Sequence, residues 1–188
     1  MKSITALFSL ILMLTGCVHS QSVLKNYSMK LDVLIDSLSI SGDQIYLSID
    51  KSEYKLSVMA DTLTIKEYPV VLGGNPVDDK LRQGDQCTPE GRFKVRTKYP
   101  HSSWDKFIWI DYPNEDSWTK HNNAKHLGLI EETANIGGEI GIHGVPRGSD
   151  EIIDLGMNWT LGCISLKNED INDFYPYISA GTLVIIEQ

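Results

Sequence analysis

The stretch IHGVPRGSDEIIDLGMNWTLGCISL, residues 142–166, contains one histidine and one cysteine, each next to a glycine. A free thiol is only about 3% thiolate at pH 7, and it becomes an effective nucleophile when an imidazole accepts its proton. Gly162 allows a tight backbone turn beside Cys163, and the amides nearby could serve a developing oxyanion. Gly144 allows another backbone or a substrate to approach His143 closely. The stretch therefore contains the parts of a nucleophile and its base. A buried thiol beside an unrelated imidazole is the competing interpretation.

Short segments on both sides of this stretch alternate or cluster apolar and β-branched residues, which is typical of β-strands. A helix is expected over 168–178, where Asn168 can cap acids in the first turn. A second short helix is expected within 121–130, and 31–40 fits either a helix or a strand. Many short strands with one or two short helices predict a mainly β fold, a barrel or a sandwich. The expected strands cover 44–50, 54–60, 62–73, 91–99, 106–113, 137–144, 162–166 and 181–188.

The length and charge of the chain limit the classes of protein it can belong to. Its 188 residues suit a single domain with its own core, and no repeat or low-complexity segment is present. The formal net charge of −8 argues against a sequence-independent nucleic-acid binder, because such a protein needs a basic face to displace counterions. We therefore expect no nucleic-acid partner.

The first residues differ in composition from the rest. Residues 4–14 form an apolar run of signal-peptide length that is too short to span a bilayer comfortably. LTGC, residues 14–17, resembles the bacterial lipobox, which implies that Cys17 is diacylated and becomes the new N-terminus. We expect a lipoprotein signal peptide over 1–16, a lipidated N-terminus and tether over 17–43, and a folded domain over 44–188. A plain signal peptide or an uncleaved anchor is the alternative.

A lipidated Cys17 would place the domain on the periplasmic side of the cell envelope, anchored to a bacterial membrane, since two or more acyl chains give stable attachment. Export also exposes the remaining thiols, Cys87 and Cys163, to an oxidising compartment. A disulfide between them remains open.

The neighbourhood of His143 and Cys163 resembles a known family. IHG followed by WTLGCISL is similar to the signature of L,D-transpeptidases with a YkuD-type catalytic domain, which is His-Gly and then Ser/Thr-x-Gly-Cys. The resemblance covers about residues 44–187 and implies a β-rich YkuD-type domain in which Cys163 is the nucleophile and His143 its general base. The further blocks IDKSEYKLSV, GDQCTPEGRF, IDYPNEDS, GGEIGIHG and GTLVIIE follow in the family order.

The same resemblance implies roles for neighbouring residues. In several family members the residue after the histidine orients the imidazole through its carbonyl, and that role falls to Gly144. Thr160 matches the Ser/Thr position, and the amides around Gly162 are expected to help form the oxyanion hole.

This chain departs from the common motif at two positions. Leu161 stands where a second histidine is common, and Ser165 stands where arginine or asparagine is common. The chain resembles a branch with GCIS and a preceding tryptophan, Trp159, which is expected either to line the cleft or to pack. We count Trp159, Thr160, Gly162 and Ser165 as oxyanion or substrate-binding candidates.

The resemblance implies acyl transfer in two steps on peptidoglycan. The Cys163 thiolate is expected to attack a tetrapeptide stem, release the terminal D-amino acid and pass the acyl group to an amine. Hydrolysis, as in an L,D-carboxypeptidase or an amidase acting on stems or protein–peptidoglycan links, is one alternative. A non-catalytic peptidoglycan-binding lipoprotein with a Cys87–Cys163 disulfide is the other. We expect no cofactor, no metal and a monomer.

The other candidate residues receive structural interpretations. Cys87 is expected to be a non-catalytic thiol, and His101, His121 and His126 lack the spacing of metal ligands. Trp104, Trp109 and Trp118 are expected to be core or wall residues.

Overall fold

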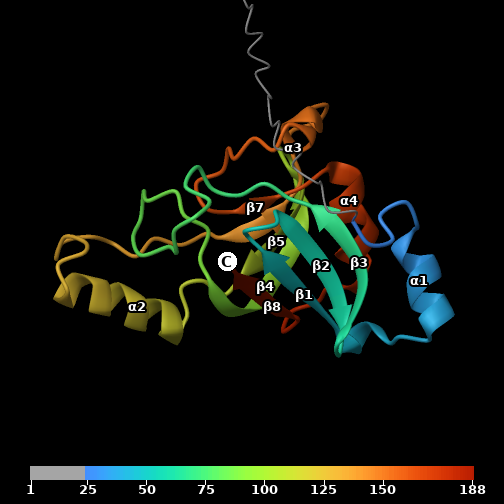
Figure 1. Ribbon diagram of the computed structural model, residues 1–188, viewed down its shortest axis with the longest axis horizontal. Helices are drawn as coiled ribbons and strands as arrows, with labels where there is room; N and C mark the ends of the chain where they lie inside the picture. Colours follow the sequence, from blue (N-terminus) through green and yellow to red (C-terminus); the bar gives the residue numbers. More distant parts are fainter. Residues whose placement is uncertain (1–23) are drawn as a thin grey trace, which may run out of the picture.

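A computed structural model describes residues 24–188 and contains eight β-strands with a few short helices (Figure 1). The predicted mainly β fold is confirmed, and every predicted strand segment overlaps one of the observed strands. The observed strands are often shorter than predicted, because the sequence pattern continues into flanking loops. They are β1 (Ile45–Asp50), β2 (Lys55–Ala60), β3 (Leu63–Pro69), β4 (Gly91–His101), β5 (Asp105–Ile110), β6 (Gly141–His143), β7 (Ile164–Ser165) and β8 (Leu183–Glu187).

The strands form one sheet in the order β3-β2-β1-β8-β4-β5-β6-β7. Only two neighbouring pairs are parallel, β1 with β8 and β6 with β7. The long strand β4 connects the two halves, because its first residues pair with β8 and its later residues with β5. Beyond β3, Val71 pairs with Ser165 of β7. This bridge joins the two ends of the strand order, so the sheet closes on itself and β7 lies at the closure.

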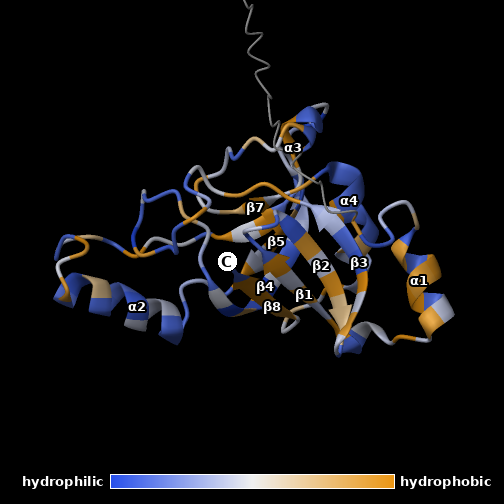
Figure 2. Ribbon diagram, viewed as in Figure 1, coloured by the Kyte–Doolittle hydropathy of each residue, from blue (hydrophilic) through white to orange (hydrophobic). Residues whose placement is uncertain are grey.

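Alternation along the strands builds the core. In β1 the residues Ile45, Leu47 and Ile49 are buried and their neighbours are half-buried, as expected when successive side chains point to opposite faces. In β2 the same alternation buries Leu56 and Val58. The hydropathy colouring shows the apolar residues concentrated in the sheet (Figure 2).

The described residues also form four α-helices and two 3₁₀ turns, more than the one or two helices predicted. α2 (Glu115–His126) begins before the predicted segment, because the Asn114 side chain accepts a hydrogen bond from the Ser117 N–H at 3.0 Å and caps it. α2 is largely hydrophilic and projects away from the sheet (Figures 1 and 2). The other α-helices are α1 (Leu31–Leu38), α3 (Glu151–Asp154) and α4 (Asn168–Phe174), and the 3₁₀ turns are η1 (Gly42–Gln44) and η2 (Tyr175–Tyr177).

The predicted helix over 168–178 is confirmed as α4 followed by η2. Its predicted cap is wrong. Asn168 is the first helical residue rather than the N-cap, and its side-chain oxygen accepts a hydrogen bond from the Val145 N–H at 3.0 Å. Asn168 therefore ties the start of α4 to the chain that follows His143.

The prediction of a tether up to residue 43 requires correction, because residues 24–43 fold against the domain. The backbone of Lys25 accepts a hydrogen bond from the Glu67 N–H at 3.0 Å, so it extends the edge of β3. α1 buries Leu31, Leu34 and Ile35 in the core. The apolar face of α1 gives this segment enough buried surface to remain attached.

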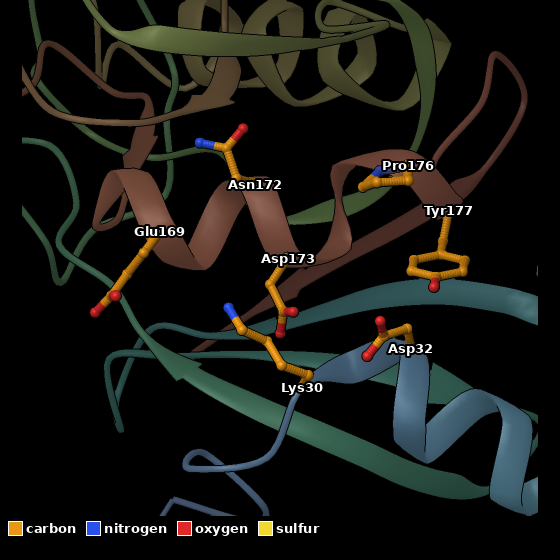
Figure 3. A pocket seen from close by; sticks show the side chains of 7 residues that line it. All are labelled: Lys30, Asp32, Glu169, Asn172, Asp173, Pro176 and Tyr177. Carbon is orange, nitrogen blue, oxygen red and sulfur yellow. The ribbon is translucent and has the colours of Figure 1, made fainter.

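A buried polar cluster strengthens the attachment of this segment to α4. The ammonium of Lys66 on β3 lies 2.7 Å from Asp173, which also accepts a hydrogen bond from Tyr68 at 2.8 Å. Tyr27 donates to Asp170 at 3.0 Å. A pocket of about 430 Å³ lies beside this cluster, between the start of α1 and α4 (Figure 3). It is lined by Lys30, Asp32, Glu169, Asn172, Asp173, Pro176 and Tyr177.

Within residues 24–188, no helix has both the length and the apolar character needed to cross a membrane. The predicted signal peptide, the first part of the predicted tether and Cys17 lie outside the described residues.

Candidate active site

Cys163 stands at the end of a tight turn immediately before β7. The Thr160 hydroxyl donates to the Cys163 carbonyl at 2.7 Å and accepts from the Gly162 N–H at 3.2 Å. Gly162 has a φ of 137°, and a Cβ on it would lie 2.6 Å from the carbonyl oxygen of Cys87. Only glycine fits this position, so Gly162 fixes how Cys163 enters the strand.

We expect Gly162→Ala to destabilise the fold by about 2–6 kcal/mol, because it combines backbone strain with a steric clash. Gly156→Ala is the matched control, since Gly156 also has a positive φ, 62°, but a Cβ added to it would meet no atom within 4 Å. Its cost should be about 1–2 kcal/mol. Denaturant unfolding of the two variants measures the difference, and equal costs would show that the contact with Cys87 is unimportant.

His143 ends β6, which runs parallel to β7. Ile142 pairs with Ile164 and His143 pairs with Ser165. Because side chains alternate along a strand, Cys163 and His143 belong to the same face of this pair of strands. No hydrogen bond joins the two side chains. The sulfur instead lies 3.5 Å from the Glu139 carbonyl.

A backbone carbonyl fixes the tautomer of His143. Its Nδ1 lies 2.7 Å from the Gly144 carbonyl oxygen, which can only accept a hydrogen bond. Nδ1 therefore carries the proton, and Nε2 keeps the lone pair needed by a base. Gly144 is itself closely packed, since a Cβ there would lie 2.1 Å from the side-chain oxygen of Asn168.

Three aromatic side chains enclose the imidazole of His143. Trp104 stacks on it with ring centroids 4.5 Å apart, and the ring of Phe107 is nearly parallel to it with centroids 5.8 Å apart. Trp159 meets it edge-on at 5.6 Å. His101 stacks on Trp104 at 4.4 Å, so the rings of His101, Trp104 and His143 form a continuous stack. We call Trp104, Phe107 and Trp159 the aromatic cage. This cage leaves His143 only 2% exposed and restricts rotation of its ring.

Burial determines the charge state of both groups. It lowers the pKa of His143 to about 4, with His101 adding a small effect in the same direction and the Gly144 carbonyl opposing it. Burial raises the pKa of the Cys163 thiol to about 11, opposed by the Gly141 N–H and the Lys80 charge. Both groups are therefore neutral at pH 7. Desolvation disfavours both charges, so the thiol has to transfer its proton during the reaction.

We expect Trp104→Leu to raise the pKa of His143 from about 4 toward the value of about 6.5 for an exposed imidazole, because water then reaches the ring. Titration of the imidazole resonances by NMR measures this shift. Trp118→Leu, at an exposed tryptophan on α2 that does not contact His143, is the control. An unchanged His143 titration in Trp104→Leu would refute the role of the cage.

Two further predicted site residues have other contacts. Ser165 is fully buried and lies 3.3 Å from the same Gly144 carbonyl that orients His143, so the prediction that it contacts substrate is wrong. The Gly162 N–H is occupied by Thr160 and does not supply an oxyanion donor. The Cys163 N–H has no hydrogen-bond partner among the described residues and is the better candidate.

Trp159 packs on Val71, Val145 and Ile153, as one of its two expected roles requires. Its ring also meets that of His143 edge-on. Its indole nitrogen is buried without a partner in the described structure. Leu161, at the variant position of the motif, is 76% exposed.

Both cysteines of the described region are free thiols, Cys87 buried and Cys163 half-buried. His121 and His101 form separate local contacts, His121 with the Leu81 carbonyl and His101 with Trp104. Among the described residues, no group of three or more His, Cys, Asp or Glu side chains could hold a metal ion.

A second pocket, of about 420 Å³, is lined by residues that include His101, Val145, Arg147 and Asn168. His101 stacks on Trp104 of the aromatic cage. Neither this pocket nor the one beside α1 is lined by Cys163 or His143.

The fold agrees with comparisons to known proteins. The structure is similar to Bd1075 of Bdellovibrio bacteriovorus, with a TM-score of 0.54 and 22% identity over 77% of this chain and 48% of that one. It is also similar to the helical cell shape determining protein Pgp2 of Campylobacter jejuni, with a TM-score of 0.55 and 20% identity over 85% and 56% of the two chains. L,D-transpeptidase 3 of Mycobacterium tuberculosis, in complex with a faropenem-derived adduct, matches with a TM-score of 0.50 and 15% identity over 77% and 60% of the two chains.

At these identities the likeness defines a shared fold, and the chain spans only about half the length of the first two relatives. No curated protein matches the sequence significantly. The model of the YkuD family, the L,D-transpeptidase catalytic domain, matches residues 44–186. The chain therefore belongs to the L,D-transpeptidase catalytic domain family.

Proposed function

We propose that this protein is a peptidoglycan L,D-transpeptidase in which Cys163 is the nucleophile and His143 the general base. The observation that carries the proposal is the hydrogen bond from His143 Nδ1 to the Gly144 carbonyl, which leaves Nε2 as the base on the face that also carries Cys163. Membership in the family and the likeness to a structure that holds a faropenem-derived adduct support it.

The first half-reaction starts from the neutral pair. His143 Nε2 takes the thiol proton as Sγ attacks the carbonyl of the L,D-peptide bond in a tetrapeptide stem. The Cys163 N–H stabilises the oxyanion. The imidazolium then protonates the departing amine of the terminal D-amino acid, and a thioester remains on Cys163.

The second half-reaction releases the enzyme. An acceptor amine attacks the thioester carbonyl while His143 takes a proton from it, and the proton then returns to the leaving sulfur. Transfer prevails over hydrolysis only if the amine is held in position, because water is always present at high concentration. Peptidoglycan stems are thus both donor and acceptor in the proposed reaction.

Digestion of purified muropeptides, with the products resolved by mass, tests the proposal. New cross-linked dimers support transfer, whereas loss of the terminal D-amino acid without dimers identifies an L,D-carboxypeptidase. Release of free peptide from cross-links or from linked protein identifies an amidase. The absence of any change with a folded enzyme would leave the peptidoglycan-binding function and contradict the proposed reaction.

We further propose that the protein is anchored to a bacterial membrane through lipid on Cys17, on the periplasmic side of the envelope. The lipobox-like LTGC supports this proposal. The folded domain begins by Leu24, and seven residues extend at most about 25 Å. The site would thus act close to the membrane surface. Metabolic palmitate labelling tests the anchor, and label that persists in Cys17→Ala would contradict it.

A further inference from the structure

Glu139 lies directly beside the nucleophile, in the loop that leads into β6. Its carbonyl oxygen is 3.5 Å from the sulfur of Cys163. The Cα of a residue lies about 2.4 Å from its own carbonyl oxygen, so the Glu139 side chain begins within about 6 Å of the sulfur. The next residue is fixed in the sheet, because the Ile110 N–H donates to the Ile140 carbonyl at 3.2 Å. The sheet therefore holds Glu139 in its place next to the sulfur.

The backbone of Glu139 has a conformation that glutamate seldom adopts. Its φ is 59°, in the left-handed region that favours glycine, asparagine and aspartate. Gly137 and Gly138 directly precede it, and Gly137 has a φ of 82°. A third glycine at position 139 would adopt this conformation without strain. Strained residues cluster at functional sites, so the presence of glutamate here points to a function of its side chain.

The carboxylate of Glu139 is exposed and has no cationic partner among residues 24–188. Its negative charge raises the pKa of the Cys163 thiol, which opposes formation of the nucleophile. Lys80, the charged side chain with the opposite effect on this pKa, is paired with Asp85 at 2.7 Å. A free carboxylate beside the nucleophile offsets this cost if it binds a cationic reactant.

We propose that Glu139 selects the acceptor: its carboxylate binds the ammonium form of the attacking amine next to the thioester on Cys163. The inference rests on the proposed function and deepens it by naming the residue that favours an amine over water. An alkylamine with a pKa of about 10 reaches the site as an ammonium ion, whereas water carries no charge. Binding the ammonium raises the effective concentration of the acceptor at the thioester.

The protons of the acceptor balance in this scheme. The bound ammonium first loses one proton to solvent, and the amine nitrogen then attacks the thioester carbonyl. His143 takes a second proton from this nitrogen and passes it to the sulfur of Cys163 as the carbon–sulfur bond breaks. The new amide leaves, and the enzyme returns to its neutral thiol.

A binding cycle tests the contact between Glu139 and the amine without any turnover. The two probes are a tripeptide stem with a free side-chain amine and the same peptide acetylated on that amine. Both are titrated by NMR into the full chain carrying Cys163→Ala, with and without Glu139→Gln. Acetylation should weaken binding about fivefold more when Glu139 is present than in Glu139→Gln, the upper value for an exposed ion pair.

Asp61→Asn is the matched control for the loss of a carboxylate. Asp61 is also exposed and has a positive φ of 50°, but it lies in the turn between β2 and β3. Asp61→Asn should leave the effect of acetylation unchanged. Glu139→Asp, which keeps the charge on a shorter side chain, should retain part of the effect. Thermal unfolding of each variant reports on its fold.

The fate of the thioester tests the choice of acceptor. A tetrapeptide stem serves as donor at pH 8, and the products of transfer and hydrolysis are quantified by mass at one fixed acceptor concentration. Glu139→Gln should lower the ratio of transfer to hydrolysis about fivefold for an amine acceptor, since the ammonium loses its ion pair. Hydroxylamine, a nucleophile that is uncharged at this pH, is the matched acceptor, and its ratio should not change.

Equal effects of acetylation with Glu139 and with Glu139→Gln would overturn the proposal. An unchanged ratio of transfer to hydrolysis in Glu139→Gln, or an equal fall with hydroxylamine, would also overturn it, because the carboxylate would then not select a cationic acceptor. Failure of the proposed function is distinguishable, since it would appear as a wild-type enzyme that leaves muropeptides unchanged while binding of the tripeptide still depends on its amine and on Glu139.

Discussion

Cys163→Ala is expected to lower turnover of tetrapeptide stems by on the order of 10⁴-fold or more, because it removes the atom that forms the thioester. The change replaces a thiol with hydrogen at a half-buried position, so little packing is lost. Muropeptide analysis by mass measures the turnover, and circular dichroism with thermal unfolding verifies the fold.

The same substitution at the other free thiol is the control for this result. Cys87 is buried, and its side chain lies 3.4 Å from the Asp85 carbonyl. Cys87→Ala should retain turnover at least about 100-fold above that of Cys163→Ala, because its sulfur forms no bond to substrate. Turnover that persists in Cys163→Ala would rule out Cys163 as the nucleophile.

His143→Gln is expected to lower turnover by about 10²–10⁴-fold, the usual contribution of a positioned general base. In the wild type, turnover should fall as the pH drops through the His143 pKa of about 4, because the imidazolium cannot accept the thiol proton. In His143→Gln the thiolate must form without the base. The residual rate should therefore rise with pH up to the Cys163 pKa of about 11.

His121→Gln is the matched control for the base, since His121 is equally buried and its Nδ1 lies 2.6 Å from the Leu81 carbonyl. Its turnover should exceed that of His143→Gln by at least about tenfold, the lower part of the range for a general base. If the two variants lost turnover equally, the effect of His143→Gln would reflect folding rather than proton transfer.

The strands were predictable because alternation is a local signal that each segment carries by itself. β1 and β2 show it in the burial of Leu47 and Val58. The attachment of residues 24–43 was missed, since its backbone is bound by side chains distant in sequence. Lys66 donates to the Met29 carbonyl, and Asp173 accepts from the Leu31 N–H. The segment 31–40, for which a helix or a strand was expected, forms the helix α1, whereas α3 was missed. α3 has only four residues, too few to show a helical period.

The candidate site was predictable at Cys163, His143 and Gly144 because a short motif contains them. Trp104 was taken for a core or wall residue. Its contact with His143 forms only when β5 pairs with β6, and no sequence spacing encodes that contact. Ser165 was assigned to substrate binding from its place after the cysteine, but it is fully buried at the closure of the sheet.

The most direct test of the account is the mass of the intact protein after brief incubation with a tetrapeptide stem and no acceptor amine, followed by peptide mapping. We predict an adduct equal to the stem without its terminal D-amino acid, located on the peptide that contains Cys163 and absent in Cys163→Ala. An adduct on another residue, or products formed with the Cys163 peptide unmodified at every time point, would contradict covalent catalysis by this thiol.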